Sequence, residues 1–100
     1  MRYNIPDRVL RDIARFAKEN GIGTVTLFGS RARGTHTPRS DIDLAVTDGD
    51  ALGFKLDLNE RANTLLTFDV VDLGRDISDE LKKDIERDGV VIYDGKQETR

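Results

Sequence analysis

Hydrophobic residues recur at steps of three and four in three stretches of the chain, and this spacing predicts amphipathic helices. In the first stretch, which follows Pro6, the positions are Val9, Leu10, Ile13, Phe16 and Ala17. In the second they are Phe54, Leu58, Ala62 and Leu65, and in the third they are Ile77, Leu81 and Ile85. Asn20-Gly21 and Asp88-Gly89 provide stops for the first and third helices, because glycine often follows a helix end.

Four shorter stretches have the composition of β-strands: Thr24–Phe28, Asp41–Val46, Phe68–Leu73 and Val90–Tyr93. β-Branched and aromatic side chains, which favour strands, are frequent in them. The second stretch alternates between hydrophobic positions and acidic or small ones, which predicts one buried face. Between the first two strands, Ser30 is expected to cap a short helix that runs through Ala32 and ends at Gly34.

The order of the expected elements is helix, strand, short helix, strand, helix, strand, helix, strand. It contains no repeat and no linker, and 100 residues is a common size for one domain. The expected fold class is therefore α/β or α+β, with a mixed sheet of about four strands and helices packed on it. Residues 1–94 are predicted to form the domain, and the polar residues 95–100 to form a disordered tail.

Composition narrows the possible chemistry. The charged fraction is 35%, and neither a long apolar run nor a signal peptide is apparent, so a soluble cytoplasmic protein is expected. The chain has no cysteine, so a metal would need oxygen ligands or His36, which favours hard cations such as Mg²⁺. The net charge of -3 argues against a broad nucleic-acid-binding surface.

Asp41 and Asp43 are the first candidate site residues. Two residues apart in a strand, their carboxylates point to one face about 7 Å apart along the chain. Two adjacent carboxylates repel each other. A fold tolerates this repulsion most easily when a divalent cation lies between the two groups, and oxygen ligands favour magnesium or manganese. The pair alone is weak evidence, since Asp-x-Asp is also common in turns and at solvated strand edges.

Gly29-Ser30 is the second candidate, because it stands where a strand ends and a short helix begins. Backbone N–H groups at such a junction favour phosphate, and Gly29 allows close approach. Ser30 can donate its hydroxyl, while Arg31 or Arg33 can pair with phosphate oxygens. The alternative is an ordinary Gly-Ser turn with solvated arginines.

Asp69 is the third candidate, an acidic residue within an otherwise hydrophobic strand. If this strand pairs beside Asp41–Val46, Asp69 faces the same site and can accept the proton of an attacking hydroxyl. Asp72 points to the opposite face and is interpreted as solvated or structural. A register shift of one residue would exchange the two, so Asp72 stays open as the third carboxylate.

The segment Gly29-Ser30-Arg31-Ala32-Arg33-Gly34, followed by Ser40-Asp41-Ile42-Asp43-Leu44, resembles the signature of the DNA polymerase β-type nucleotidyltransferases, in particular the minimal nucleotidyltransferase branch. The resemblance covers nearly the whole chain. It implies that Asp41 and Asp43 bind two Mg²⁺ ions and that Asp69 binds the catalytic one. It further implies that Gly29 and Ser30 hold a nucleoside triphosphate, ATP by default, with Arg31 assisting the departing pyrophosphate.

The implied reaction transfers a nucleoside monophosphate to an acceptor hydroxyl. Small proteins of this branch are often antitoxins of a HEPN-type toxin, and the resemblance therefore implies a protein partner that receives AMP. The rival hypothesis is a non-catalytic binding module that neutralises its partner by contact alone. Transfer to an antibiotic or to RNA is disfavoured, because the sequence shows no aromatic stacking surface or broad basic face.

Overall fold

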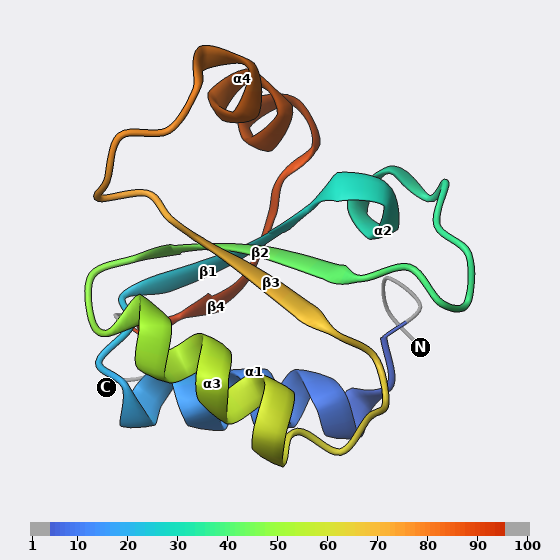
Figure 1. Ribbon diagram of the computed structural model, residues 1–100, viewed down its shortest axis with the longest axis vertical. Coiled ribbons are helices and arrows are strands. Elements are labelled where there is room, and N and C mark those ends of the chain that lie inside the picture. Colours follow the sequence, from blue (N-terminus) through green and yellow to red (C-terminus); the bar gives the residue numbers. More distant parts are fainter. Residues whose placement is uncertain (1–4, 96–100) are drawn as a thin grey trace.

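The computed structural model describes residues 5–95, in which helices and strands follow the expected order. The helices are α1 (Asp7–Glu19), α2 (Gly29–Arg33), α3 (Ala51–Arg61) and α4 (Asp79–Asp88). The strands are β1 (Thr24–Phe28), β2 (Ile42–Thr47), β3 (Phe68–Asp72) and β4 (Val90–Asp94). Figure 1 shows them along the chain.

The four strands form one mixed sheet in the order β3-β2-β1-β4, which confirms the predicted α+β class. β1 is antiparallel to both β2 and β4, whereas β2 and β3 are parallel. Parallel neighbours need a crossover connection, and α3 supplies it between β2 and β3. The candidate residues of β2 and β3 therefore lie on adjacent strands that run in the same direction.

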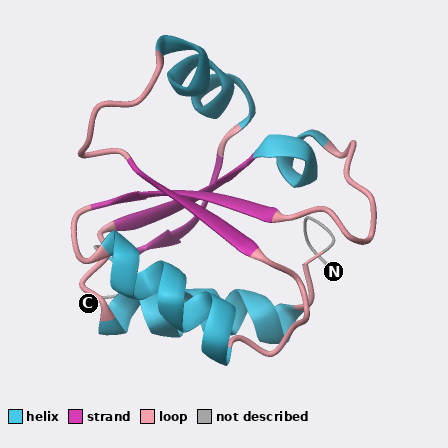
Figure 2. Ribbon diagram, viewed as in Figure 1, coloured by secondary structure: helices cyan, strands magenta, loops and turns pink. Residues whose placement is uncertain are grey.

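The hydrophobic core lies between one face of the sheet and helices α1 and α3 (Figure 2). The alternation predicted for β2 is confirmed, since Ile42, Leu44 and Val46 have no exposed surface. Four of the five hydrophobic positions predicted for α1 are buried, namely Val9, Ile13, Phe16 and Ala17. In Figure 1, α2 and α4 lie on the other side of the sheet.

Two predicted helix boundaries are wrong. α3 ends at Arg61, because Ala62 has an extended backbone (φ -67°, ψ 145°), and Leu65 is fully exposed in the following loop. The Asn63 N–H donates to the Asp12 carboxylate at 2.8 Å, which ties this loop to α1. Ser30 does not cap α2, since Phe28 occupies the capping position and Ser30 lies within the first turn.

α4 also differs from its prediction. It begins at Asp79, where the Ser78 hydroxyl accepts from the Leu81 N–H at 3.1 Å, so Ile77 lies before the helix. No residue of α4 is buried, although its hydrophobic positions repeat at helical spacing. The helix therefore lies over the sheet without contributing to the core.

Two further predictions concern membrane-spanning segments and the C-terminal tail. No helix within residues 5–95 is long and apolar enough to cross a membrane. Of the predicted tail, the Gly95 N–H donates to Gly23 O at 2.9 Å, and residues 96–100 lie outside the described part of the chain.

β3 is an edge strand, and the Asn59 side chain of α3 covers part of its open edge. Asn59 Oδ1 accepts from the Phe68 N–H at 2.9 Å, and Nδ2 donates to Phe68 O at 3.2 Å. One amide thus takes the place of a neighbouring strand at this position, which protects backbone groups that would otherwise be free to pair with another chain.

Asn59→Ala is expected to lower the free energy of unfolding by about 1–2 kcal/mol, because two backbone groups at a part-buried edge lose their partners. Urea unfolding measures this loss. Asn63→Ala is the matched control, since the hydrogen bonds of Asn63 use its backbone atoms only. An equal loss in both variants would contradict the role assigned to the Asn59 amide.

Candidate functional site

The candidate carboxylates gather where β2 and β3 run side by side. The parallel register pairs Asp43 with Asp69, and paired residues of neighbouring strands point to the same face of a sheet. Asp72 pairs with Val46 and therefore points to the opposite face. Its carboxylate accepts from the Gly74 N–H at 2.8 Å and forms an ion pair with Arg75 at 3.6 Å, so it stabilises the turn after β3.

The three aspartates differ in their surroundings. Asp41 is exposed directly before β2, two residues from Asp43. Asp43 is partly buried, whereas the Asp69 side chain is 59% exposed and lies 3.9 Å from Lys55 Nζ of α3. Only Asp43 is therefore held within the body of the protein.

The pKa of the Asp43 carboxyl is raised above its ordinary value. Burial is the largest cause, followed by the negative charges of Asp69 and Asp41, while the positive charge of Arg33 opposes the shift. The charged form of Asp43 is thus disfavoured by its two acidic neighbours. Such a cluster of negative charge favours a bound cation.

Gly29 makes room for the Asp43 carboxylate. A Cβ atom at position 29 would collide with Asp43 Oδ2, and the backbone of Gly29 has a φ of 76°, which favours glycine. β1 and β2 bring the two residues together, because Phe28 pairs with Asp43. The glycine predicted to admit a phosphate therefore also determines where this carboxylate lies.

Arg31 has a structural role that the sequence did not reveal. Its side chain is buried, and it is the one charged residue of the buried class within residues 5–95. Nε and Nη2 donate to Ser40 O at 3.2 and 3.0 Å, so Arg31 ties the loop before Asp41 to α2. Ser30 is partly exposed in the same helix. The predicted roles of Arg31 and Ser30 toward phosphate remain predictions.

Arg33 is the alternative to Arg31 as the predicted partner of phosphate oxygens. Its side chain is 39% exposed, and Nη1 lies 3.5 Å from Asp88 Oδ2 at the end of α4. Spacing in the sequence did not distinguish the two arginines, because both lie in one short helix. Their difference arises from the segments packed around that helix.

The chemistry of the three carboxylates suits a hard divalent cation such as Mg²⁺. Their described positions do not enclose one, since within residues 5–95 no three acidic or histidine side chains are grouped so that they could hold a metal ion. Asp69 is paired with Lys55 instead. The residue types therefore fit the predicted metal ions, but a complete metal-binding cage is not preformed.

A hollow of about 350 Å³ lies beside this cluster, at the ends where β2 and β3 begin. Arg39 and Asp41 line it from one loop, and Leu65, Leu66 and Thr67 from another. The site thus combines a carboxylate cluster with an adjoining space that has one cationic and two hydrophobic residues.

Comparisons with known proteins agree with the fold. A solved structure described as a toxin-antitoxin with AMP-PNP is 27% identical, with a TM-score of 0.67, over 89% of this chain and 76% of that one. A mutant of the toxin-antitoxin MntA-HpeT is 25% identical, with a TM-score of 0.68, over 95% and 77%. A search of curated proteins found no match.

The comparison with protein families covers most of the chain. The family model described as polymerase beta, nucleotidyltransferase matches residues 11–98, a range that includes the glycine-serine turn and all three aspartates. The mixed sheet of four strands with its four helices is consistent with the fold of that family. This chain belongs to the polymerase beta nucleotidyltransferase family.

Proposed function

We propose that this protein is a metal-dependent nucleotidyltransferase that transfers AMP from ATP to a hydroxyl of a partner protein, a HEPN-type toxin, and so acts as a cytoplasmic antitoxin. The observation that carries the proposal is the pairing of Asp43 with Asp69 beside Gly29, in a chain of the nucleotidyltransferase family. The similarity to a toxin-antitoxin solved with AMP-PNP supports the nucleotide and the kind of partner.

In this proposal Asp41, Asp43 and Asp69 hold two Mg²⁺ ions, Asp69 binding the catalytic one. When bound, the ions neutralise charge on the transferring phosphoryl group. Gly29 and Ser30 hold the triphosphate. Asp69 is exposed on the face of Asp43, where it can accept the proton of the acceptor hydroxyl.

Two observations favour the rival function, a binding module that neutralises its partner by contact alone. The carboxylates are not arranged as a metal cage within residues 5–95, and Asp69 pairs with Lys55 at 3.9 Å. Both side chains of that pair are well exposed, so the ion pair is worth about 1 kcal/mol or less. A bound cation can outcompete so weak an interaction, and transfer therefore remains the better-supported function.

Transfer is tested with each of four labelled nucleoside triphosphates, Mg²⁺ and the product of the adjacent gene as the proposed toxin. Wild type is expected to label the toxin, with ATP as the preferred donor. Asp41→Asn should abolish labelling, because it removes a proposed metal ligand that is exposed directly before β2.

Asp72→Asn is the matched control, since Asp72 points away from the site. Labelling that survives in Asp72→Asn and is lost in Asp41→Asn supports the proposal. Neutralisation of the toxin without labelling by any of the four nucleotides would support contact alone instead.

A further inference from the structure

The loop that joins α3 to β3 presents a leucine to solvent. Leu65 is 104% exposed, the highest value among the exposed large hydrophobic residues within residues 5–95. A single exposed leucine is common on protein surfaces, so its surroundings decide whether it has a role. For Leu65 these surroundings are a loop held in place and a hollow beside the carboxylate cluster.

Contacts on both sides of Leu65 hold the loop in place. Before it, the Asn63 N–H donates to the Asp12 carboxylate of α1 at 2.8 Å, and Arg8 Nε donates to Asn63 O at 3.2 Å. After it, Leu66 packs against the hydrophobic core. Leu65 is therefore presented in a defined position before a partner arrives, which reduces the conformational entropy lost on binding.

The hollow of about 350 Å³ connects this loop to the proposed catalytic residues. It is lined by Arg39, Asp41, Leu65, Leu66 and Thr67. Thr67 O accepts from the Ile42 N–H at 3.0 Å, so its two walls meet directly before β2 and β3. Asp69 follows Thr67 by two residues, about 7 Å along an extended chain. A side chain in this hollow thus lies beside Asp41 and within reach of Asp69, the proposed acceptor of the hydroxyl proton.

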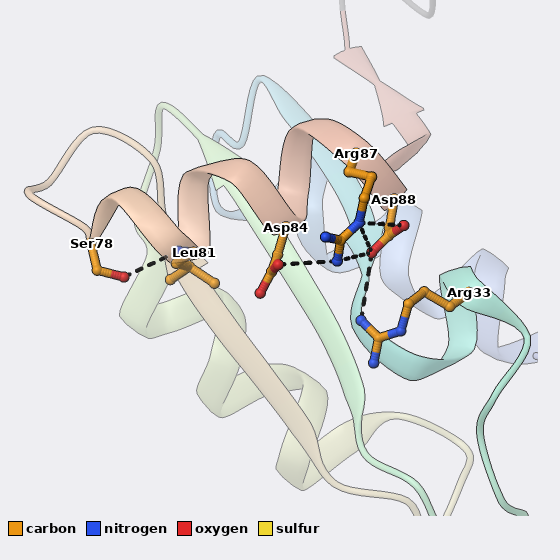
Figure 3. A network of polar contacts seen from close by, with 6 residues as sticks. All are labelled: Arg33, Ser78, Leu81, Asp84, Arg87 and Asp88. Carbon is orange, nitrogen blue, oxygen red and sulfur yellow. Dashed lines mark hydrogen bonds and ion pairs between the residues drawn. The ribbon is translucent and has the colours of Figure 1, made fainter.

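Arg39 gives the opposite wall of the hollow a positive charge. It is exposed, and within residues 5–95 no hydrogen bond or ion pair involves its side chain. Arg33, the other exposed arginine of this segment, is paired with Asp88 of α4 instead (Figure 3). A guanidinium without an internal partner is available to a carboxylate, which it can bind through two parallel hydrogen bonds.

The lining of the hollow indicates the class of its occupant. Among the described residues that form it there is no aromatic side chain on which a nucleobase could stack, and Arg39 is the one cation. Two leucines on one wall and an arginine on the other are complementary to a protein segment that has a hydrophobic and an acidic side chain.

We propose that this hollow is the acceptor site, which binds a segment of the partner protein whose acceptor hydroxyl is flanked by a hydrophobic side chain, packed on Leu65, and an acidic one, paired with Arg39. The inference rests on the proposed function. In the transfer that this site serves, the hydroxyl oxygen bonds to the α-phosphorus of ATP, its proton passes to Asp69, and pyrophosphate leaves.

Contact at Leu65 is tested without turnover. The chain has no cysteine, so Leu65→Cys introduces a single thiol. With the product of the adjacent gene at about ten times its Kd, alkylation of this thiol by a maleimide should slow about tenfold, because the bound fraction is protected. Leu52→Cys is the matched control. Leu52 is also an exposed leucine (68%) but lines another hollow, and its alkylation rate should not change.

Steady-state transfer of labelled AMP tests the acceptor role. Leu65→Ser and Arg39→Gln are each expected to raise KM for the acceptor protein about fivefold, the loss of one contact. The value of kcat and KM for ATP should not change, because both side chains act only on acceptor binding. Leu52→Ser and Arg75→Gln are the controls, since both residues line the other hollow and should leave KM unchanged.

The outcomes separate the acceptor site from the proposed function. If wild type transfers AMP but Leu65→Ser and Arg39→Gln keep the wild-type KM, the acceptor site is wrong while the proposed function stands. Equal protection of Leu65→Cys and Leu52→Cys would also overturn it, because the contact would not be specific to this hollow. If wild type transfers no nucleotide, the proposed function fails and the acceptor role fails with it.

Discussion

Asp43→Asn is expected to reduce nucleotidyl transfer about 100-fold or more, since the carboxylate at the centre of the charged cluster is lost. The amide keeps the size of the side chain and fits the same space beside Gly29. Transfer of labelled AMP to the toxin measures the effect. Residual transfer near the wild-type rate would show that Asp43 is not part of the catalytic site.

The same substitution is expected to stabilise the protein at neutral pH. Burial, Asp69 and Asp41 raise the pKa of Asp43 in the folded state. A carboxyl with a raised pKa stabilises the fold while it is protonated, and that contribution is lost as pH rises through the folded pKa. At neutral pH the charged group therefore costs stability, and asparagine removes the cost.

Thermal unfolding in EDTA measures this gain. The melting temperature of Asp43→Asn should exceed that of wild type at neutral pH, because the repulsion is removed. The difference in melting temperature between the variant and wild type should be absent at a pH well below the ordinary pKa of 3.8. It should appear as the pH rises through the raised pKa of Asp43. A variant that is less stable than wild type at neutral pH would contradict the repulsion inferred for this cluster.

Gly29→Ala is expected to lower the free energy of unfolding by about 2–4 kcal/mol, the sum of a strained positive φ and a steric conflict. The added Cβ would meet Asp43 Oδ2, so the carboxylate must move or the strands must separate. Transfer should fall as well, because Asp43 leaves its position. Urea unfolding and the labelling assay measure the two effects.

Gly34→Ala separates the two causes. Gly34 has a φ of 80°, similar to that of Gly29, but no atom lies within 4 Å of its added Cβ. Its cost should be the backbone strain alone, about 1–2 kcal/mol. In an Asp43→Ala background the cost of Gly29→Ala should approach that of Gly34→Ala. Equal costs for both glycines in the wild-type background would show that the contact with Asp43 is not a steric limit.

Local patterns predicted most of the secondary structure, and their errors have local causes as well. The alternation in β2 and the helical spacing in α1 gave the correct buried faces, because each hydrophobic position faces the core. The hydrophobic spacing predicted that the α3 helix continues through Ala62 and Leu65. The helix ends at Arg61 instead, because hydrogen bonds to α1 hold the next residues in a loop. Contacts between distant segments override a local pattern in that way.

The sequence identified the residue types of the candidate site, but it did not show which of these side chains contact one another. Nothing in the sequence distinguishes Arg31 from Arg33 within one short helix, yet Arg31 is buried against the loop before Asp41 and Arg33 faces Asp88. Asp88 lies 55 positions after Arg33, and no spacing rule links residues so far apart. Asp69 and Lys55 likewise meet only because α3 packs against β3.

The sequence by itself determined the order of the elements, the buried faces of α1 and β2 and the residue types of the site, because periodicity and turn chemistry act between near neighbours in the chain. Only the tertiary structure decided that Asp69 rather than Asp72 lies beside Asp43, since this follows from the register of two strands joined by α3. It also decided which arginine is buried. Both depend on how separate segments pack, and a one-residue shift in register would turn each side chain of a strand to the opposite face.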